Sequence, residues 1–99
     1  MSLQLLGTAQ VWNNVTASRA LTTTYTNSKN YPIMVNVDCN VGASSSYIQL
    51  NVSSLAVSFM QNVNASSAQR MTLSAIVPQG STYSVTASGS SINACYELY

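Results

Sequence analysis

Histidine is absent from this 99-residue chain, and charged residues make up only 5% of it, against roughly 25% in an average soluble domain. Without histidine the chain cannot form a Ser-His-Asp or Cys-His arrangement for nucleophilic catalysis. The two acids, Asp38 and Glu97, are the minimum for a two-carboxylate glycosidase, and we interpret both as solvated or paired with arginine. Two acids and two separated cysteines supply too few ligands for zinc or calcium. The sequence therefore predicts a protein that is not an enzyme and that uses no cofactor or metal.

Positive charge is equally scarce, because Arg19, Lys29 and Arg70 are the only basic residues and the net charge is +1. Nucleic-acid binding depends on a basic patch that contacts phosphates, and three cations cannot form one. Binding to a membrane surface through a polybasic face is excluded for the same reason. No apolar run approaches the roughly 20 residues that a membrane-spanning helix needs. We therefore expect neither a nucleic-acid partner nor membrane insertion.

Hydrophobic residues, by contrast, make up 46% of the chain, and Ser, Thr and Asn supply most of its polarity. High hydrophobicity with low charge is the opposite of the composition of disordered chains. The length suits one domain with a modest core. We expect a single domain over residues 10–99 and interpret residues 1–9 as an N-terminal extension or expression remnant, since the start lacks the basic and long apolar regions of a signal peptide.

Short alternating segments separated by turn residues are the main structural signal. The clearest covers residues 33–41, where Ile33, Val35 and Val37 alternate with polar neighbours. Similar segments cover residues 47–52, 55–60, 70–77, 83–87 and 92–98, and Pro78-Gln-Gly80 reads as a turn between two of them. One helix candidate, Ala65 to Met71, is too short to be stable unless it is docked. The predicted fold is all-β, an antiparallel β-sandwich of about seven to eight strands, either Ig-like or jelly-roll-like.

The two cysteines fall in different phases of their predicted strands. Cys39 shares the apolar phase of its strand, whereas Cys95 lies in the polar phase of a last strand whose predicted apolar face is formed by Ile92, Ala94, Tyr96 and Leu98. A cross-strand disulfide is geometrically conceivable. We nevertheless interpret both residues as free thiols that pack as small hydrophobic groups.

Individual aromatic and charged residues give further expectations. Trp12, Tyr25, Tyr83 and Tyr96 are interpreted as core or corner residues whose polar ends find backbone partners. In a chain with so few charges we expect Arg19 to form a partly buried ion pair with Glu97, which would clamp the N-terminal segment onto the last strand. Tyr47 lies in the polar phase of its strand beside a Ser-rich loop and is the aromatic residue best placed to contact a ligand.

An ordered set of short motifs covers nearly the whole chain: Gln10-Val-Trp12, Val15-Thr-Ala-Ser-Arg19, Thr24-Tyr-Thr-Asn27, Pro32-Ile33, Val77-Pro-Gln-Gly-Ser-Thr-Tyr83 and Tyr96-Glu-Leu98. This set resembles the C-terminal tip domains of bacteriophage tail fibres. One departure is at the end, where Cys95 occupies the position at which the family pattern has tryptophan.

The resemblance implies a structural role for the residues that match it, which are Trp12, Arg19, Tyr25, Asn27, Pro32, Pro78, Gly80, Tyr83 and Glu97. Residues 39–70 match nothing specific, and loops on a rigid scaffold commonly carry specificity. The expected receptor-binding residues are therefore Tyr47, Gln49, Asn51, Asn62, Asn64, Gln69 and Arg70.

For the whole protein, the resemblance implies a homotrimeric fibre tip that is synthesised in the bacterial cytoplasm and carried on the virion. This tip would adsorb the phage to a host polysaccharide or outer-membrane protein. Two alternatives stay open. One is a purely structural or trimerisation module of a fibre or baseplate, which binding to intact host cells would distinguish. The other is a cellular adhesin, pilin-like subunit or free carbohydrate-binding module, which predicts a monomer.

Overall fold

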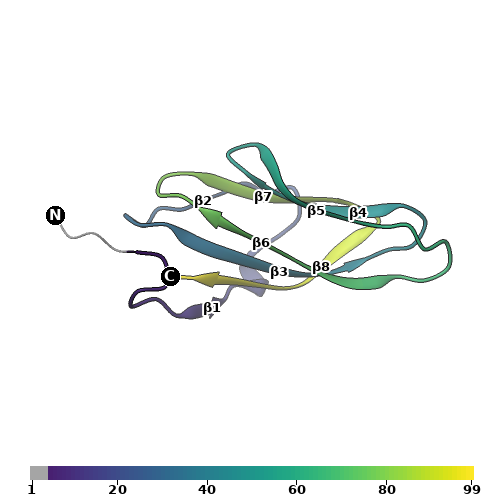
Figure 1. The fold of residues 1–99 in the computed structure, drawn as a ribbon, viewed down its shortest axis with the longest axis horizontal. Coiled ribbons are helices and arrows are strands. Elements are labelled where there is room, and N and C mark those ends of the chain that lie inside the picture. The colour runs from purple at the N-terminus through teal and green to yellow at the C-terminus, as the bar shows by residue number, and fades with distance from the viewer. Residues whose placement is uncertain (1–4) are drawn as a thin grey trace.

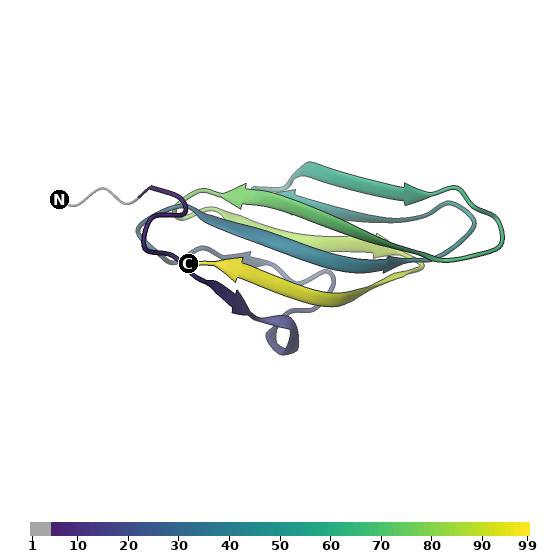
Figure 2. The same cartoon turned by 60° about the horizontal axis from the view of Figure 1, so that its bottom comes forward.

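The computed structural model describes residues 5–99, which form eight β-strands and a single short 3-10 helix (Figure 1). The elements are β1 (Trp12–Asn14), η1 (Thr16–Ser18), β2 (Tyr25–Thr26), β3 (Ile33–Val41), β4 (Ser46–Val52), β5 (Leu55–Asn62), β6 (Gln69–Val77), β7 (Thr82–Ser88) and β8 (Ser90–Leu98). In the figures η1 is the small coil between β1 and β2, and the long strands run along the length of the molecule (Figure 2).

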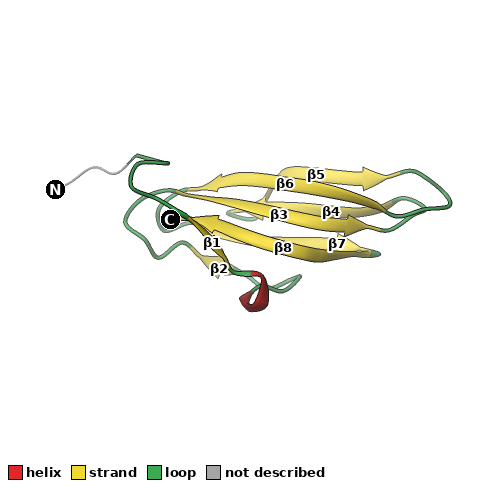
Figure 3. Ribbon diagram, turned by 90° about the horizontal axis from the view of Figure 1, so that it is seen from below, coloured by secondary structure: helices red, strands yellow, loops and turns green. Residues whose placement is uncertain are grey.

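The strands form two antiparallel four-stranded sheets, and their order is β1-β8-β3-β6 in sheet A and β2-β7-β4-β5 in sheet B. Figure 3 shows β6, β3, β8 and β1 following one another across one layer. The pairs β1–β8, β2–β7, β3–β6 and β4–β5 are nested, as if one long hairpin had been folded over itself. This nesting is the jelly-roll arrangement of two Greek keys. The predicted all-β sandwich is confirmed, and the topology selects the jelly-roll alternative over the Ig-like one.

The core lies between the inner faces of the two sheets. Alternate residues of β3 from Ile33 to Val41 are buried, and they meet the inward residues Ile48, Leu50 and Val52 of β4. The period of two that was visible in the sequence thus matches the burial pattern of the two central strands. Pro78 and Gly80 form the predicted turn between β6 and β7, in which the Ser81 amide donates to the Pro78 carbonyl and Gly80 has a φ of +76°.

The prediction for the last strand was wrong. Cys95, expected on the polar face, is buried, as is Glu97. The reason is an irregularity in the β3–β8 ladder, where Cys39 pairs with Ile92 but Asp38 pairs with Ala94, so Asn93 is an extra residue. Such a bulge reverses the phase of every residue beyond it. Ile92 therefore packs against the core on one side of the bulge, and Cys95 does so on the other.

Two further expectations are corrected. Residues 65–71 form no helix, because β6 already begins at Gln69 and pairs along its whole length with β3. Trp12 is not a core residue, since 51% of it is exposed. In β1 it is Asn13 that lies opposite the buried Glu97, so Trp12, which lies opposite Leu98, points to the outer face of sheet A.

Tight connections at both ends need unusual backbone conformations. The two-residue connection Ser53–Ser54 between β4 and β5 has positive φ values of 51° and 66°, as type I′ hairpin turns require. At the other end, the Gly42 amide donates to the Gly89 carbonyl, and a Cβ on Gly42 would lie only 2.3 Å from that oxygen. A side chain at residue 42 would therefore force these two connections apart. Ser44 and Ser45 in the same connection also have positive φ.

Gln10 ties the start of the described chain to the residue before β3, because its side-chain amide accepts from the Gly7 amide and donates to the Pro32 carbonyl. Residues 1–4, the first part of the predicted extension, lie outside the described residues. Among residues 5–99 there is no helix long and apolar enough to cross a membrane.

Candidate functional site

The outer face of sheet B carries three of the predicted receptor-binding residues. Tyr47, Gln49 and Asn51 alternate with the buried residues of β4 and therefore share one face. The Gln49 amide donates to Asn51 Oδ1 at 2.6 Å, and Asn51 in turn donates to the hydroxyls of Ser84 and Thr86 on β7 at 3.3 and 3.2 Å. These bonds satisfy the side-chain amide of the buried Asn51 and hold Gln49 in a fixed orientation.

An aromatic pair lies beside these amides. The rings of Tyr47 on β4 and Phe59 on β5 stack with centroids 5.5 Å apart and an interplanar angle of 27°. Phe59 lies opposite Gln49 in the ladder, and half of it is exposed. None of the five charged residues lies on the outer face of sheet B. This face therefore combines ring surface with neutral donors and acceptors, which suits a neutral polar ligand such as a sugar.

The other four predicted receptor-binding residues do not join this face. Asn62 is 2% exposed and closes the interior at the end of β5, so its side chain is not available to a receptor. Asn64 is exposed in the following loop, where its Oδ1 accepts from the Ser66 amide at 2.9 Å. Gln69 lies opposite Val41 at the start of β6.

Arg70 lies on the outer face of sheet A, where its guanidinium donates to both carboxylate oxygens of Asp38. This hydrogen-bonded contact lowers the pKa of the Asp38 carboxyl and raises the pKa of Arg70. Arg70 is already paired and lies on the opposite side of the molecule from Tyr47, so the seven predicted residues do not form one site.

Asn27, predicted as structural, joins connections from both sheets. Its side-chain amide donates to the carbonyls of Tyr31 at 2.9 Å and Val77 at 3.0 Å, and its Oδ1 accepts from the Lys29 amide at 3.0 Å. Asn27 is almost fully buried. An asparagine here therefore fastens the β2–β3 connection (residues 27–32) to the end of β6.

The predicted pair between Arg19 and Glu97 is confirmed, and a tyrosine completes it. Arg19 follows η1, Glu97 is on β8 of sheet A, and Tyr83 is on β7 of sheet B. Arg19 Nη2 lies 2.8 Å from Glu97 Oε2, its Nε donates to Tyr83 Oη at 2.7 Å, and Tyr83 donates to the same carboxylate oxygen. The side chains are 20% and 7% exposed for Arg19 and Glu97. This cluster clamps the N-terminal segment onto β8, and it also bridges the two sheets.

Burial and hydrogen bonding shift the pKa values of two side chains in the cluster, Arg19 and Tyr83. Burial lowers the pKa of Arg19, but the hydrogen bonds to Tyr83 and Glu97 outweigh burial and raise that pKa overall. Burial and the bond to the Glu97 carboxylate raise the pKa of Tyr83 far above its ordinary value. The Arg19 guanidinium also lies 4.4 Å from the centroid of the Tyr25 ring, a cation–π contact. Arg19 is therefore a fixed cation, and each of its three side-chain nitrogens already contacts a protein acceptor.

Both cysteines are free, as expected from the sequence, and both are buried, although Cys95 was expected on the polar face of its strand. Burial raises the pKa of Cys39 to about 12 and that of Cys95 to about 11. Thiols react as thiolates, so these two groups stay protonated and inert at neutral pH. Within residues 5–99, no group of three or more His, Cys, Asp or Glu side chains could hold a metal ion.

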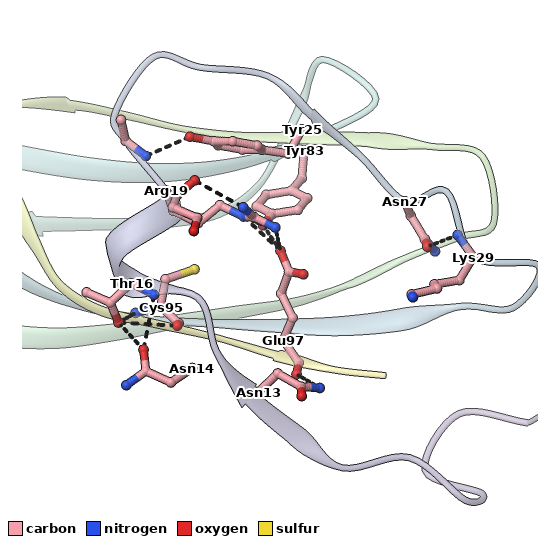
Figure 4. Close-up of polar contacts among 12 residues, drawn as sticks. Asn13, Asn14, Thr16, Arg19, Tyr25, Asn27, Lys29, Tyr83, Cys95 and Glu97 are labelled. Carbon is pink, nitrogen blue, oxygen red and sulfur yellow. Dashed lines mark hydrogen bonds and ion pairs between the residues drawn. The ribbon is translucent and has the colours of Figure 1, made fainter.

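A polar cavity of about 180 Å³ lies next to the Arg19–Tyr83–Glu97 cluster. Its lining residues come from the segment after η1, from β2 and the β2–β3 connection, and from the ends of β3 and β8: Arg19, Thr26, Asn27, Ser28, Lys29, Ile33, Glu97 and Tyr99. The Lys29 ammonium lies 4.7 Å from the centroid of the Tyr99 ring. Figure 4 shows Arg19, Glu97, Asn27 and Lys29 around this region.

Sequence reasoning missed Phe59, Lys29 and Tyr99 as possible ligand contacts. Phe59 shares the alternating apolar spacing of Leu55 and Val57, which is typical of a core-facing strand. In the structure it lies opposite Gln49 on the outer face of sheet B, and all three residues are exposed on this edge strand. Lys29 and Tyr99 lie 70 residues apart in sequence, and only the pairing of the last strand brings them together. No local pattern in the sequence could have indicated that contact.

Comparison with known proteins supports the fold but assigns no family. No family model matches the chain, and no curated protein matches its sequence. Among solved structures, the chain is similar to part of dimeric latent PorU from Porphyromonas gingivalis, with a TM-score of 0.53 and 10% sequence identity. The match covers 87% of this chain but only 10% of the PorU chain. At this level of identity the likeness concerns the fold alone: this chain is similar in architecture to a small part of a much longer protein.

Proposed function

We propose that this chain is a non-enzymatic recognition domain of a bacteriophage tail fibre tip, which binds a polysaccharide or protein on the bacterial surface during adsorption. In this proposal the domain is made in the bacterial cytoplasm and becomes part of the virion. The outer face of sheet B carries the proposal: it is uncharged, it exposes the stacked rings of Tyr47 and Phe59, and it holds the neighbouring Gln49 amide in place.

The chemistry of that face favours a polysaccharide over a protein receptor. Sugar rings present apolar C–H surface that packs on aromatic faces, and their hydroxyls pair with amides. The eight-stranded jelly roll is also the scaffold of lectin and viral capsid domains, which supports the proposal by analogy.

Binding of fluorescently labelled protein to an array of bacterial surface polysaccharides, followed by intact-cell binding for the strains that score, tests this function. We expect Tyr47→Ala and Phe59→Ala each to weaken binding by about tenfold or more, as for aromatic residues at the centre of an interface. Tyr96→Ala is the matched control, because Tyr96 lies on the outer face of sheet A. Equal loss in all three variants, or no binding to any polysaccharide or cell, would contradict the proposal.

A second candidate, a structural module that trimerises a fibre without touching the host, rests on a different observation. Trp12, Leu98, Met34 and Ile76 lie directly opposite one another across four strands and form an apolar row on the outer face of sheet A. Contiguous exposed apolar surface commonly marks an assembly interface. A trimeric mass by light scattering together with no binding to host cells would favour this candidate, whereas a trimer that binds cells fits the fibre-tip proposal.

A further inference from the structure

We infer that the cavity beside Glu97 is a second binding site, and that its ligand is a neutral group with adjacent hydroxyls, such as one monosaccharide unit. This inference goes beyond the proposed function and does not depend on it. The cavity lies where β2 leads into β3 and β8 ends, whereas Tyr47 lies toward the opposite ends of β4 and β7. The two sites can therefore be tested separately.

The first observation is a solvent-accessible carboxylate oxygen, on a largely buried residue, to which no described side chain or backbone group donates. Arg19 and Tyr83 both contact Oε2 of Glu97, and among the residues that the structure describes no donor reaches Oε1. Glu97 is nine-tenths buried, and it lines the cavity. In Figure 4 the second carboxylate oxygen points away from Arg19, toward the side on which Asn27 and Lys29 lie. An acceptor that is open to a cavity and has no protein donor is suited to receive a hydrogen bond from a ligand.

The second observation is the charge around that oxygen. An anionic ligand would face the Glu97 carboxylate, and a cationic ligand would face the Arg19 guanidinium, which lies 2.8 Å from the same carboxylate. At Oε1 itself, like charges at such short range disfavour both an anionic group, which Glu97 repels, and a cationic group, which Arg19 repels. A hydroxyl group donates to Oε1 without adding a charge. The arrangement therefore selects a neutral donor.

Lys29 supplies a hydrogen-bond donor that complements the Glu97 acceptor. Its ammonium lines the same cavity and has a cation–π contact with Tyr99 but no carboxylate partner among the described residues. An ammonium donates hydrogen bonds and accepts none, so the ligand must accept at this point. Two neighbouring hydroxyls, one donating to Glu97 and one accepting from Lys29, meet both requirements.

The size of the cavity limits the ligand. Its volume of about 180 Å³ is below the roughly 300–1,000 Å³ of pockets that take drug-sized molecules. The cavity suits one sugar residue, not an oligosaccharide. Most of its lining is polar, with Thr26 and Ser28 beside the charged groups, and Ile33 is the one aliphatic residue among those that line it.

The test is a titration of ¹⁵N-labelled full chain, followed by NMR, with methyl glycosides of glucose, galactose, mannose and N-acetylglucosamine. Sodium acetate and ethylammonium chloride are the charged probes. We expect at least one glycoside to shift the amide signals of residues 26–29 and 99 with saturation, and neither charged probe to do so. Shifts with acetate or ethylammonium instead of a glycoside, or no saturable shift with any glycoside, would overturn the inference.

Variants separate this site from the face around Tyr47. Lys29→Met removes one donor from an exposed position and should weaken glycoside binding by about tenfold or more, the effect of losing one hydrogen bond to a charged group. Arg70→Met removes the same charge from the outer face of sheet A and should leave the titration unchanged, as should Tyr47→Ala. If Lys29→Met bound the glycoside as well as the wild type, or Tyr47→Ala abolished these shifts, the assigned site would be wrong.

Discussion

At each end of the sandwich a buried asparagine holds the connections together by hydrogen bonds, although the two ends differ in charge. We call the end with residues 27–32, 53–54 and 78–81 the Asn27 end, and the end with residues 42–45, 63–68 and 89 the Asn62 end. Each asparagine accepts at Oδ1 from the amide two residues later, at 3.0 Å in both cases. Asn27 donates to the carbonyls of Tyr31, Val77 and Pro78. Asn62 donates to those of Val41 and Ser67. Each backbone carbonyl also accepts from another connection.

The difference is that only the Asn27 end has charged groups between the sheets. There Arg19, Tyr83 and Glu97 join sheet A to sheet B, and the cavity opens beside them. The Asn62 end is formed by small polar residues and backbone hydrogen bonds. The shared asparagines therefore belong to the scaffold, and what distinguishes the Asn27 end is its buried ionic chemistry.

The largest loss of stability is expected when the ionic cluster at the Asn27 end is broken. Glu97→Gln keeps the shape of the side chain but leaves the largely buried Arg19 without its counter-charge. Removing one partner of a buried pair costs about 3–5 kcal/mol of unfolding free energy, a large part of the total for a small domain. Urea unfolding followed by tryptophan fluorescence measures this loss, and Arg19→Gln should give a similar value.

The matched control is the second ion pair. Arg70 contacts both carboxylate oxygens of Asp38, but 73% of its side chain is exposed, and water screens such a pair. Arg70→Gln should therefore shift the urea midpoint by a small fraction of the shift caused by Glu97→Gln. Equal shifts for both variants would show that burial does not distinguish the two pairs.

The next largest loss of stability is expected for substitutions of the two buried asparagines, and comparing them tests whether Asn27 and Asn62 are equivalent. Asn27→Ala and Asn62→Ala each leave buried carbonyls and an amide without partners, and each should cost about 1–3 kcal/mol. Differential scanning calorimetry of the two variants checks the equality. The exposed Asn64→Ala should change stability by no more than about 0.5 kcal/mol. If Asn62→Ala kept its stability but lost receptor binding, Asn62 would belong to the receptor site, as predicted from the sequence.

The smallest change in stability is expected for substitutions of the serines with positive φ at both ends. Ser54 has a φ of 66° and Ser45 a φ of 69°, a region that costs non-glycine residues about 1–2 kcal/mol. Ser54→Gly and Ser45→Gly should each raise the unfolding free energy by about 1 kcal/mol. Ser74→Gly, on the extended strand β6, should instead lower it by about 0.5–1 kcal/mol. A loss of stability in all three variants would mean that these turn conformations are not strained.

The sequence determined the long strands because their side chains alternate with a period of two. The predicted strand over 33–41 matches β3 in both bounds, and the other five long strands were placed within two residues at each end. The pair of Arg19 and Glu97 could also be predicted, since a chain with five charged residues offers few partners. Local pattern and scarcity of charge both act without knowledge of the fold.

The candidate sites depended on features that sequence does not encode locally. The bulge at Asn93 places Cys95 and Glu97 in the interior, and a phase argument carried through from Ile92 gives the opposite result. The register of β5 against β4 places Phe59 opposite Gln49 on the outer face of sheet B, although its spacing is that of a core residue.

The sequence by itself therefore determined an all-β sandwich with a neutral surface, because alternation and composition are properties of short segments. The tertiary structure alone decided the jelly-roll order of the strands and the contact of Lys29 with Tyr99. It also decided which oxygen of Glu97 stays open to the cavity. These features depend on strands far apart in sequence, whose pairing is fixed by the packing of the whole domain.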